Sequence, residues 1–219
     1  MEKKILTIPP ELPIDTVLSE LHMDRKHKLF NRISTICESA ARAAKPVAIY
    51  SAFTPEIRDN AIFINGILFK EPFVHKMLAG NDIVIPYVAT CGPELEEWSQ
   101  TYHDMFDKFA ADAIKECYLD AVRDSLLSEV QEKYFDPEKS ISRINPGSLN
   151  EWPITGQIPL FKALGGVTGD IGVELKDSLL MVPVKSVSGI IFQTDTPYHN
   201  CQLCPRANCP GRTAPYEGD

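Results

Sequence analysis

The sequence predicts an α+β fold in which long helices pack beside a mostly antiparallel sheet. Two stretches, 14–44 and 94–134, repeat apolar residues every three or four positions, the spacing of amphipathic helices. Between them lies 61–69, whose Asn65-Gly66 pair is the strongest short signal for an antiparallel hairpin. Helices and strands are segregated rather than alternating, which is the α+β pattern and not that of a doubly wound parallel sheet.

The helical stretches have clear boundaries. In 14–44 the apolar period is interrupted between His22 and His27, and Pro46 ends the stretch. The second stretch follows a Thr-Cys-Gly-Pro turn, in which Pro93 suits the first position of a helix. It forms one or two helices before Asp136-Pro137, and its apolar stripe is expected in the core: Leu95, Trp98, Tyr102, Met105 and Phe109.

The remaining elements are short. Strands are expected at 47–53 and 83–89, and two more at 178–184 and 186–192 meet near Pro183. The segment 137–170 is rich in proline and glycine and offers only one short helix, in QIPLFKALG. Ordered loops of that length inside a compact domain are uncommon and usually functional.

Composition excludes several classes of protein. The 219 residues carry a net charge of −8 without a long Lys/Arg run, which argues against a nucleic-acid partner. No apolar stretch is long enough for a membrane span or a signal peptide, so we expect a cytoplasmic protein. Six cysteines are too sparse for a disulfide scaffold. No dinucleotide or P-loop motif is present, and SVSG departs from the G-x-S-x-G hydrolase elbow.

The loop SRINPGSLNEWP is the first candidate site. Arg143 can hold a carboxylate through two parallel hydrogen bonds. The backbone around Gly147 can approach a flat ligand, because glycine has no Cβ. The alternative is an ordered surface loop with a solvated arginine.

Read in order, two segments resemble a known family. SRINPGS followed by EWPITGQIPLF, and then IGVELKDSLLMVPVKSVSGIIF, look like the activation domain of cobalamin-dependent methionine synthase. In that family an R-x-x-P-G-Y loop precedes an SVSG strand. The similarity extends loosely through VATCGPELEEW and covers most of residues 30–200.

The resemblance implies a single α+β domain with a twisted antiparallel sheet that binds S-adenosylmethionine. Such a domain docks on a corrinoid-binding partner, so that cobalamin in the inactive Co(II) state is reduced and remethylated. A chain of 219 residues holds only this module and would act in trans on a corrinoid methyltransferase protein. It need not catalyse homocysteine methylation itself, so whether it is an enzyme in its own right stays open.

Carried over by position, the resemblance assigns individual residues. Arg143 binds the carboxylate of the methionine moiety, and Asn145, Pro146 and Gly147 line the ligand. The family's loop tyrosine is Ser148 here, and its aromatic pair falls near Tyr198 and His199. Asp120 is the counterpart of an acidic residue on the long helix.

Asp120 belongs to a row of carboxylates at helical spacing. The row is Asp112, Glu116, Asp120 and Asp124. Such a row is most often a solvated helix face, and the alternative is contact with a metal or a positively charged ligand.

The C-terminus carries a second candidate site. Cys201, Cys204 and Cys209 have C-x2-C-x4-C spacing, which suits a soft metal. A structural zinc site and an iron-sulfur cluster that delivers the electron to cobalt are equally compatible, and so are three free thiols in a disordered tail. The candidate fourth ligands are His199, Cys91, Cys37 and Cys117. We therefore divide the chain into a domain at 1–195 and a Cys-rich tail at 196–219.

Three functions compete at this point. The first is an S-adenosylmethionine-binding module for reductive activation of a corrinoid methyltransferase. The second is an interaction protein stabilised by a metal at the cysteines, without chemistry of its own. The third is a free-standing S-adenosylmethionine-dependent methyltransferase with another substrate.

Overall fold

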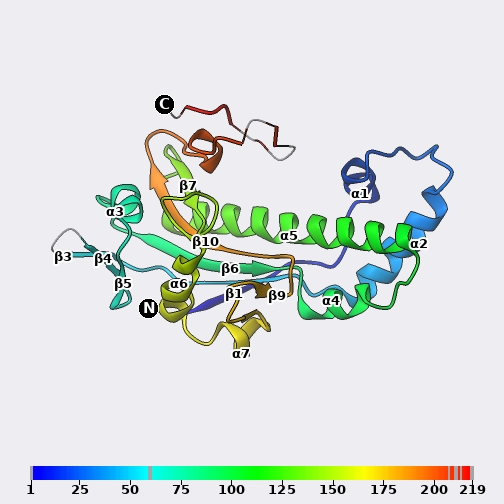
Figure 1. The fold of residues 1–219 in the computed structure, drawn as a ribbon, viewed down its shortest axis with the longest axis horizontal. Helices are drawn as coiled ribbons and strands as arrows, with labels where there is room; N and C mark the ends of the chain where they lie inside the picture. Colours follow the sequence, from blue (N-terminus) through cyan, green and yellow to red (C-terminus); the bar gives the residue numbers. More distant parts are fainter. Residues whose placement is uncertain (1, 59–60, 207, 210–211, 213, 218–219) are drawn as a thin grey trace.

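A five-stranded antiparallel sheet forms the centre of the computed structural model (Figure 1), which describes residues 2–58, 61–206, 208–209, 212 and 214–217. Adjacent strands pair antiparallel throughout in the order β1-β2-β6-β10-β7. The strands are β1 (Lys4–Thr7), β2 (Val47–Tyr50), β6 (Val84–Thr90), β7 (Ser140–Ile144) and β10 (Ser186–Thr194). Every residue of β6 is buried, because both faces of the sheet are covered.

One face of the sheet is covered by α5 (Met105–Tyr134), a helix of 30 residues that runs along the strands in Figure 1. The side chain of Asp104 caps its first turn by accepting hydrogen bonds from the Phe106 and Asp107 N–H groups. Its second half packs apolar side chains such as Val122 and Leu126 on the sheet. Among the described residues no helix combines the length and the apolar character needed to cross a membrane.

The opposite face is covered by shorter elements. Helices α3 (Pro72–Leu78), α6 (Gln157–Leu164) and α7 (Val167–Ile171) pack there with a small sheet, and the core includes Phe69, Trp152 and Phe192. The small sheet contains β3 (Glu56–Arg58), β4 (Ala61–Ile64) and β5 (Ile67–Phe69), and a separate pair joins β8 (Glu174–Leu175) to β9 (Met181–Val182).

A second core lies at the N-terminal half of α5. Helices α1 (Ile14–Glu20), α2 (Phe30–Ala43) and α4 (Pro93–Ser99) pack against it around Leu95 and Ile114. The predicted interruption of the first helical stretch is confirmed, since α1 and α2 are separate helices. The second stretch likewise divides, into α4 and α5.

The predicted α+β class and antiparallel sheet are confirmed, and so is the hairpin at Asn65-Gly66, where both residues have positive φ. The expectation that Met105 and Phe109 lie in the core is wrong: they are 86% and 58% exposed. The expected stripe assumes one continuous helix, but α4 ends at Ser99 and α5 begins at Met105. Residues that would share one face of a continuous helix therefore face different directions here.

The sequence reading also missed several elements. It missed β1, β7 and α7, and the expected strand at 178–184 shrinks to β9. These elements are short and depend on tertiary pairing: β7, for example, is fixed by its register with β10, in which Arg143 lies opposite Ile191.

Candidate functional site

A cavity of about 730 Å³ lies between α5, the edge strand β7 and the C-terminal tail. It is on the α5 side of the sheet, where the tail passes over β7 in Figure 1. Ligand pockets in proteins have volumes of about 300–1,000 Å³. The cavity therefore has the size of a small-molecule site, and it brings together segments that are far apart in the sequence.

Arg143 lies on β7 and lines this cavity. Side chains alternate along a strand, so Ile141 and Arg143 share one face of β7, and both line the cavity together with Asn145, which follows the last residue of the strand. In the described part of the chain the guanidinium of Arg143 makes no ion pair and no hydrogen bond. It is therefore available for a ligand carboxylate.

The other cations that line the cavity are already paired. Arg123 contacts Asp120 at 2.7 Å, and the Lys185 ammonium contacts Glu116 at 2.9 Å and Asp112 at 3.1 Å. These pairs are partly exposed, so each stabilises the fold only modestly. Their effect here is to fix the carboxylates at the cavity wall.

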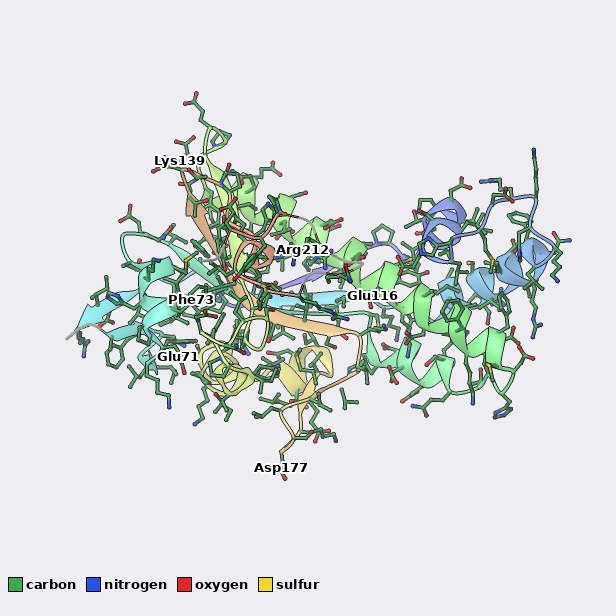
Figure 2. All side chains as sticks on the ribbon, turned by 45° about the horizontal axis from the view of Figure 1, so that its top comes forward. Glu71, Phe73, Glu116, Lys139, Asp177 and Arg212 are labelled. Carbon is green, nitrogen blue, oxygen red and sulfur yellow. The ribbon has the colours of Figure 1, made fainter. Side chains whose placement is uncertain are left out.

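The carboxylate row on α5 is therefore not simply a solvated helix face, as its spacing most often indicates. Asp112, Glu116 and Asp120 line the cavity, and Glu116 is labelled on α5 in Figure 2. Burial raises the pKa of Asp120, while the nearby Arg123 charge acts in the opposite direction. Asp124, which does not line the cavity, is 72% exposed beside Arg123.

Asn145 joins the end of β7 to the rest of the sheet. Its Nδ2 donates hydrogen bonds to Tyr87 Oη at 2.9 Å and to the Ser188 carbonyl at 2.7 Å. The side chain crosses β10 above Gly189, where a Cβ would come within 2.5 Å of Nδ2. The NPG loop (145–147) and the SVSG segment of β10 (186–189) thus depend on each other, because only glycine at position 189 leaves room for the Asn145 side chain.

Pro146, Gly147 and Ser148 form a turn beside the cavity and do not line it. The Ser148 N–H donates to the Asn145 carbonyl at 3.2 Å and Gly147 has a φ of +83°, which are features of a type II turn. A Cβ on Gly147 would meet Ile154 Cδ1 at 2.7 Å. The turn and the nearby Ile154 explain why residue 147 is glycine. The geometry therefore gives no reason to place Pro146, Gly147 or Ser148 in contact with a ligand.

Tyr198 and His199 line the cavity from the tail side. The Tyr198 N–H donates to Ser142 Oγ at 2.8 Å, and the ring contacts Phe73 at a centroid distance of 6.3 Å. Burial raises the pKa of Tyr198 to about 12. Its buried hydroxyl has no hydrogen-bond partner among the described residues, so this aromatic side chain is held between the sheet and the tail.

The tail cysteines lie around Arg212, which is labelled in Figure 2. The Arg212 guanidinium donates to the carbonyls of Cys201 at 2.8 Å and Cys204 at 3.0 Å. Cys201 lines the cavity, whereas Cys204 and Cys209 do not. Within the described residues, no group of three or more His, Cys, Asp and Glu side chains is arranged to hold a metal ion, so the geometry does not fit a zinc ion or a cluster.

The other candidate fourth ligands lie in the cores. Cys37 and Cys117 pack with α1, α2 and α5, and Cys91 is buried where β6 leads into α4. Burial raises the pKa of Cys37 to about 11 and those of Cys91 and Cys117 to about 12. Thiols in such surroundings are poor metal ligands, since the thiolate is the form that binds.

Sequence reasoning missed several residues that line the cavity. Arg123 had a local signal, because it lies three residues after Asp120 on a helix. Lys185, Glu20 and Asn200 had none, because they come from other elements and reach the cavity only in the folded chain.

Comparison with known proteins shows what the chain is similar to. No family model and no curated protein matches the sequence. Among solved structures, the crystal structure of the MetH reactivation domain bound to AdoHcy matches with a TM-score of 0.65 and 13% identity, over 91% of this chain and 81% of that one. At that identity the likeness establishes a shared fold: the chain has the α+β fold of the MetH reactivation domain.

Proposed function

We propose that this protein binds S-adenosylmethionine in the cavity between α5, β7 and the tail. The observation that carries the proposal is that one cavity collects Arg143, Asn145, Asp120 and Tyr198. The family resemblance assigns these four residues, from three separate segments of the sequence, to the ligand site. The fold neighbour is a reactivation domain bound to AdoHcy, which supports a ligand of the same class.

The carboxylate of the ligand is assigned to Arg143. A guanidinium and a carboxylate form charge-assisted hydrogen bonds, which are roughly twice as strong as neutral ones. Arg123 and Lys185 already form ion pairs with carboxylates, whereas Arg143 forms none within the described residues. Of these three cations that line the cavity, Arg143 is therefore the one assigned to the ligand carboxylate.

The positive groups of the ligand are assigned to the α5 side. Four carboxylates line the described cavity, against three arginine and lysine side chains: Glu20, Asp112, Glu116 and Asp120, against Arg123, Arg143 and Lys185. S-adenosylmethionine has an ammonium and a sulfonium for one carboxylate, so its net positive charge complements the wall. Asp120 has the role of an acidic partner for one of these cations.

The cellular role we propose is reductive activation of a corrinoid methyltransferase such as methionine synthase, in trans. In this role one electron from a separate reductant would convert the inactive Co(II) corrinoid on the partner to Co(I), which would take the methyl group of the bound S-adenosylmethionine and release S-adenosylhomocysteine. The residues of this chain hold the methyl donor and present it to the partner. The fold shared with the MetH reactivation domain supports this role.

A calorimetric titration with S-adenosylmethionine tests the binding. Wild-type protein is expected to bind, and Arg143→Ala to lose roughly ten- to one-hundredfold in affinity, since a hydrogen bond to a charged group contributes about 1.5–3 kcal/mol. Arg42→Ala, which removes an exposed arginine on α2 outside the cavity lining, is the matched control and should bind as wild type. Equal affinity for all three proteins would refute the assignment.

A methylation assay with a Co(II) corrinoid protein, together with the titration, separates the competing functions. An interaction protein stabilised by zinc or an iron-sulfur cluster would not bind S-adenosylmethionine. A free-standing methyltransferase would bind it but would not remethylate a Co(II) corrinoid protein supplied with a reductant. Formation of methylcobalamin on the partner, dependent on this protein and abolished by Arg143→Ala, is the result expected for the activation module.

A further inference from the structure

The tail contributes to the cavity a polar side chain whose acceptor atom has no partner among the described residues. Asn200 begins the short 3-10 turn η2 (Asn200–Gln202) and lines the cavity. Its Oδ1 is buried and has no hydrogen-bond partner among the described residues. Its Nδ2 is 3.5 Å from Asn145 Oδ1, the outer limit of a hydrogen bond. A buried acceptor left unpaired is unfavourable, so a donor supplied by a ligand would stabilise this arrangement.

The backbone on both sides of Asn200 is fixed. Before it, the Tyr198 N–H is bonded to Ser142 Oγ, and the His199 N–H donates to Gln202 Oε1 at 2.7 Å. After it, the Cys201 carbonyl accepts from Arg212. These contacts hold the carboxamide at the cavity wall before any ligand arrives, and such preorganisation favours binding.

We propose that the Asn200 carboxamide recognises the adenine ring of the bound nucleoside. Its Oδ1 would accept a hydrogen bond from the exocyclic amine, and its Nδ2 would donate to a neighbouring ring nitrogen. Adenine presents this donor and acceptor pair side by side, and asparagine is a side chain whose geometry matches it. The inference rests on the proposed function, because it assigns the second end of the same ligand.

Charge and spacing distinguish this assignment from an amino-acid site. A cationic ammonium is better placed against the carboxylates of Glu116 and Asp120, whereas Asn200 is neutral and suits a neutral donor. Asn200 contacts Asn145, which lies just past the end of β7, two residues and so up to roughly 6.6 Å beyond Arg143. The carboxylate and adenine sites are thus separated along the cavity, as the two ends of the ligand require.

Analogues that differ at one ring position test this inference. In S-inosylhomocysteine a carbonyl oxygen replaces the exocyclic amine of S-adenosylhomocysteine, so two acceptors would face each other at Asn200. Wild-type protein is expected to bind the adenosyl compound about tenfold or more tightly than the inosyl compound. In Asn200→Ala the preference should fall to about twofold or less. Asn31→Ala, an exposed asparagine on α2, is the matched control and should keep the wild-type preference.

The outcomes separate this inference from the proposed function. If Asn200→Ala melts like the wild type and discriminates the two analogues equally well, the adenine assignment is overturned. Adenosine and inosine differ at the same ring position and lack the amino-acid end, so a comparison of their affinities tests recognition of the ring alone. A preference for adenosine that depends on Asn200, with affinity for S-adenosylhomocysteine insensitive to Arg143→Ala, would support the inference and refute the carboxylate site. Failure of both adenosine and S-adenosylhomocysteine to bind would refute both.

Discussion

Replacement of Gly189 by alanine probes the link between the NPG loop and the sheet. A Cβ at this position would lie 2.5 Å from Asn145 Nδ2, 2.5 Å from the Ile144 carbonyl and 2.9 Å from Tyr87 Cε1. The carbonyl belongs to a strand paired with Gly189's own strand, and Tyr87 is fully buried, so neither moves easily. The Asn145 side chain must then leave, and it gives up its hydrogen bonds to Tyr87 and Ser188.

The expected cost follows from these contacts. Overpacking a core costs about 1–3 kcal/mol, and each lost hydrogen bond about 0.5–1.5 kcal/mol. Gly189→Ala should therefore lower the free energy of unfolding by about 2–6 kcal/mol, which for a chain of this size lowers Tm by roughly 4–24 °C. Urea unfolding followed by tryptophan fluorescence measures the change.

A second glycine provides the matched control. Gly169 lies in α7, and a Cβ there would have no heavy atom within 4 Å. Gly169→Ala is expected to leave stability unchanged or raise it by up to about 1 kcal/mol, because alanine favours helix. If Gly189→Ala unfolds at the same urea concentration as the wild type, the proposed packing of Asn145 across β10 is refuted.

Two further predictions concern the cavity wall and the tail. Burial holds the pKa of Asp120 above its ordinary value, so at pH 7 its ionised form destabilises the folded state. Asp120→Asn should raise the free energy of unfolding at pH 7, and this gain should be lost as the pH falls from the raised pKa of Asp120 to the ordinary carboxyl pKa. The same variant should weaken S-adenosylmethionine binding, and a variant that binds normally would contradict the role given to Asp120. For the tail, metal analysis of anaerobically purified protein tests the metal interpretation: because the described cysteines form no metal-binding group, we expect the wild type to contain neither zinc nor iron, and zinc, or iron with visible cluster absorbance, that is lost in Cys204→Ser would contradict this.

The sequence predicted the parts of the fold that are encoded locally. The paired helices, the hairpin at Asn65-Gly66 and the helix at 157–164 each have a periodic pattern or a turn residue that acts over a few positions. The strand β7 had no such signal, because SISRI is short and only its pairing with β10 makes it extended. For this reason 137–170 was predicted to be mostly loop, and the strand that carries Arg143 was missed.

The candidate site was predictable in part for the same reason. Arg143 and Asn145 belong to a motif, and Asp120 belongs to a helical row. The contributions of Lys185 and Asn200 arise only when β10 and the tail reach α5 and β7, over distances in sequence that no pattern spans. The division of the chain at 195 and 196 stays a prediction, although the tail supplies residues to the same cavity as the preceding domain.

The most direct measurement is a crystal structure of the protein with S-adenosylhomocysteine. We expect the ligand in the cavity between α5, β7 and the tail, with its carboxylate hydrogen-bonded to the Arg143 guanidinium. A ligand bound elsewhere, or an empty cavity with Arg143 directed into solvent at a saturating ligand concentration, would contradict the account.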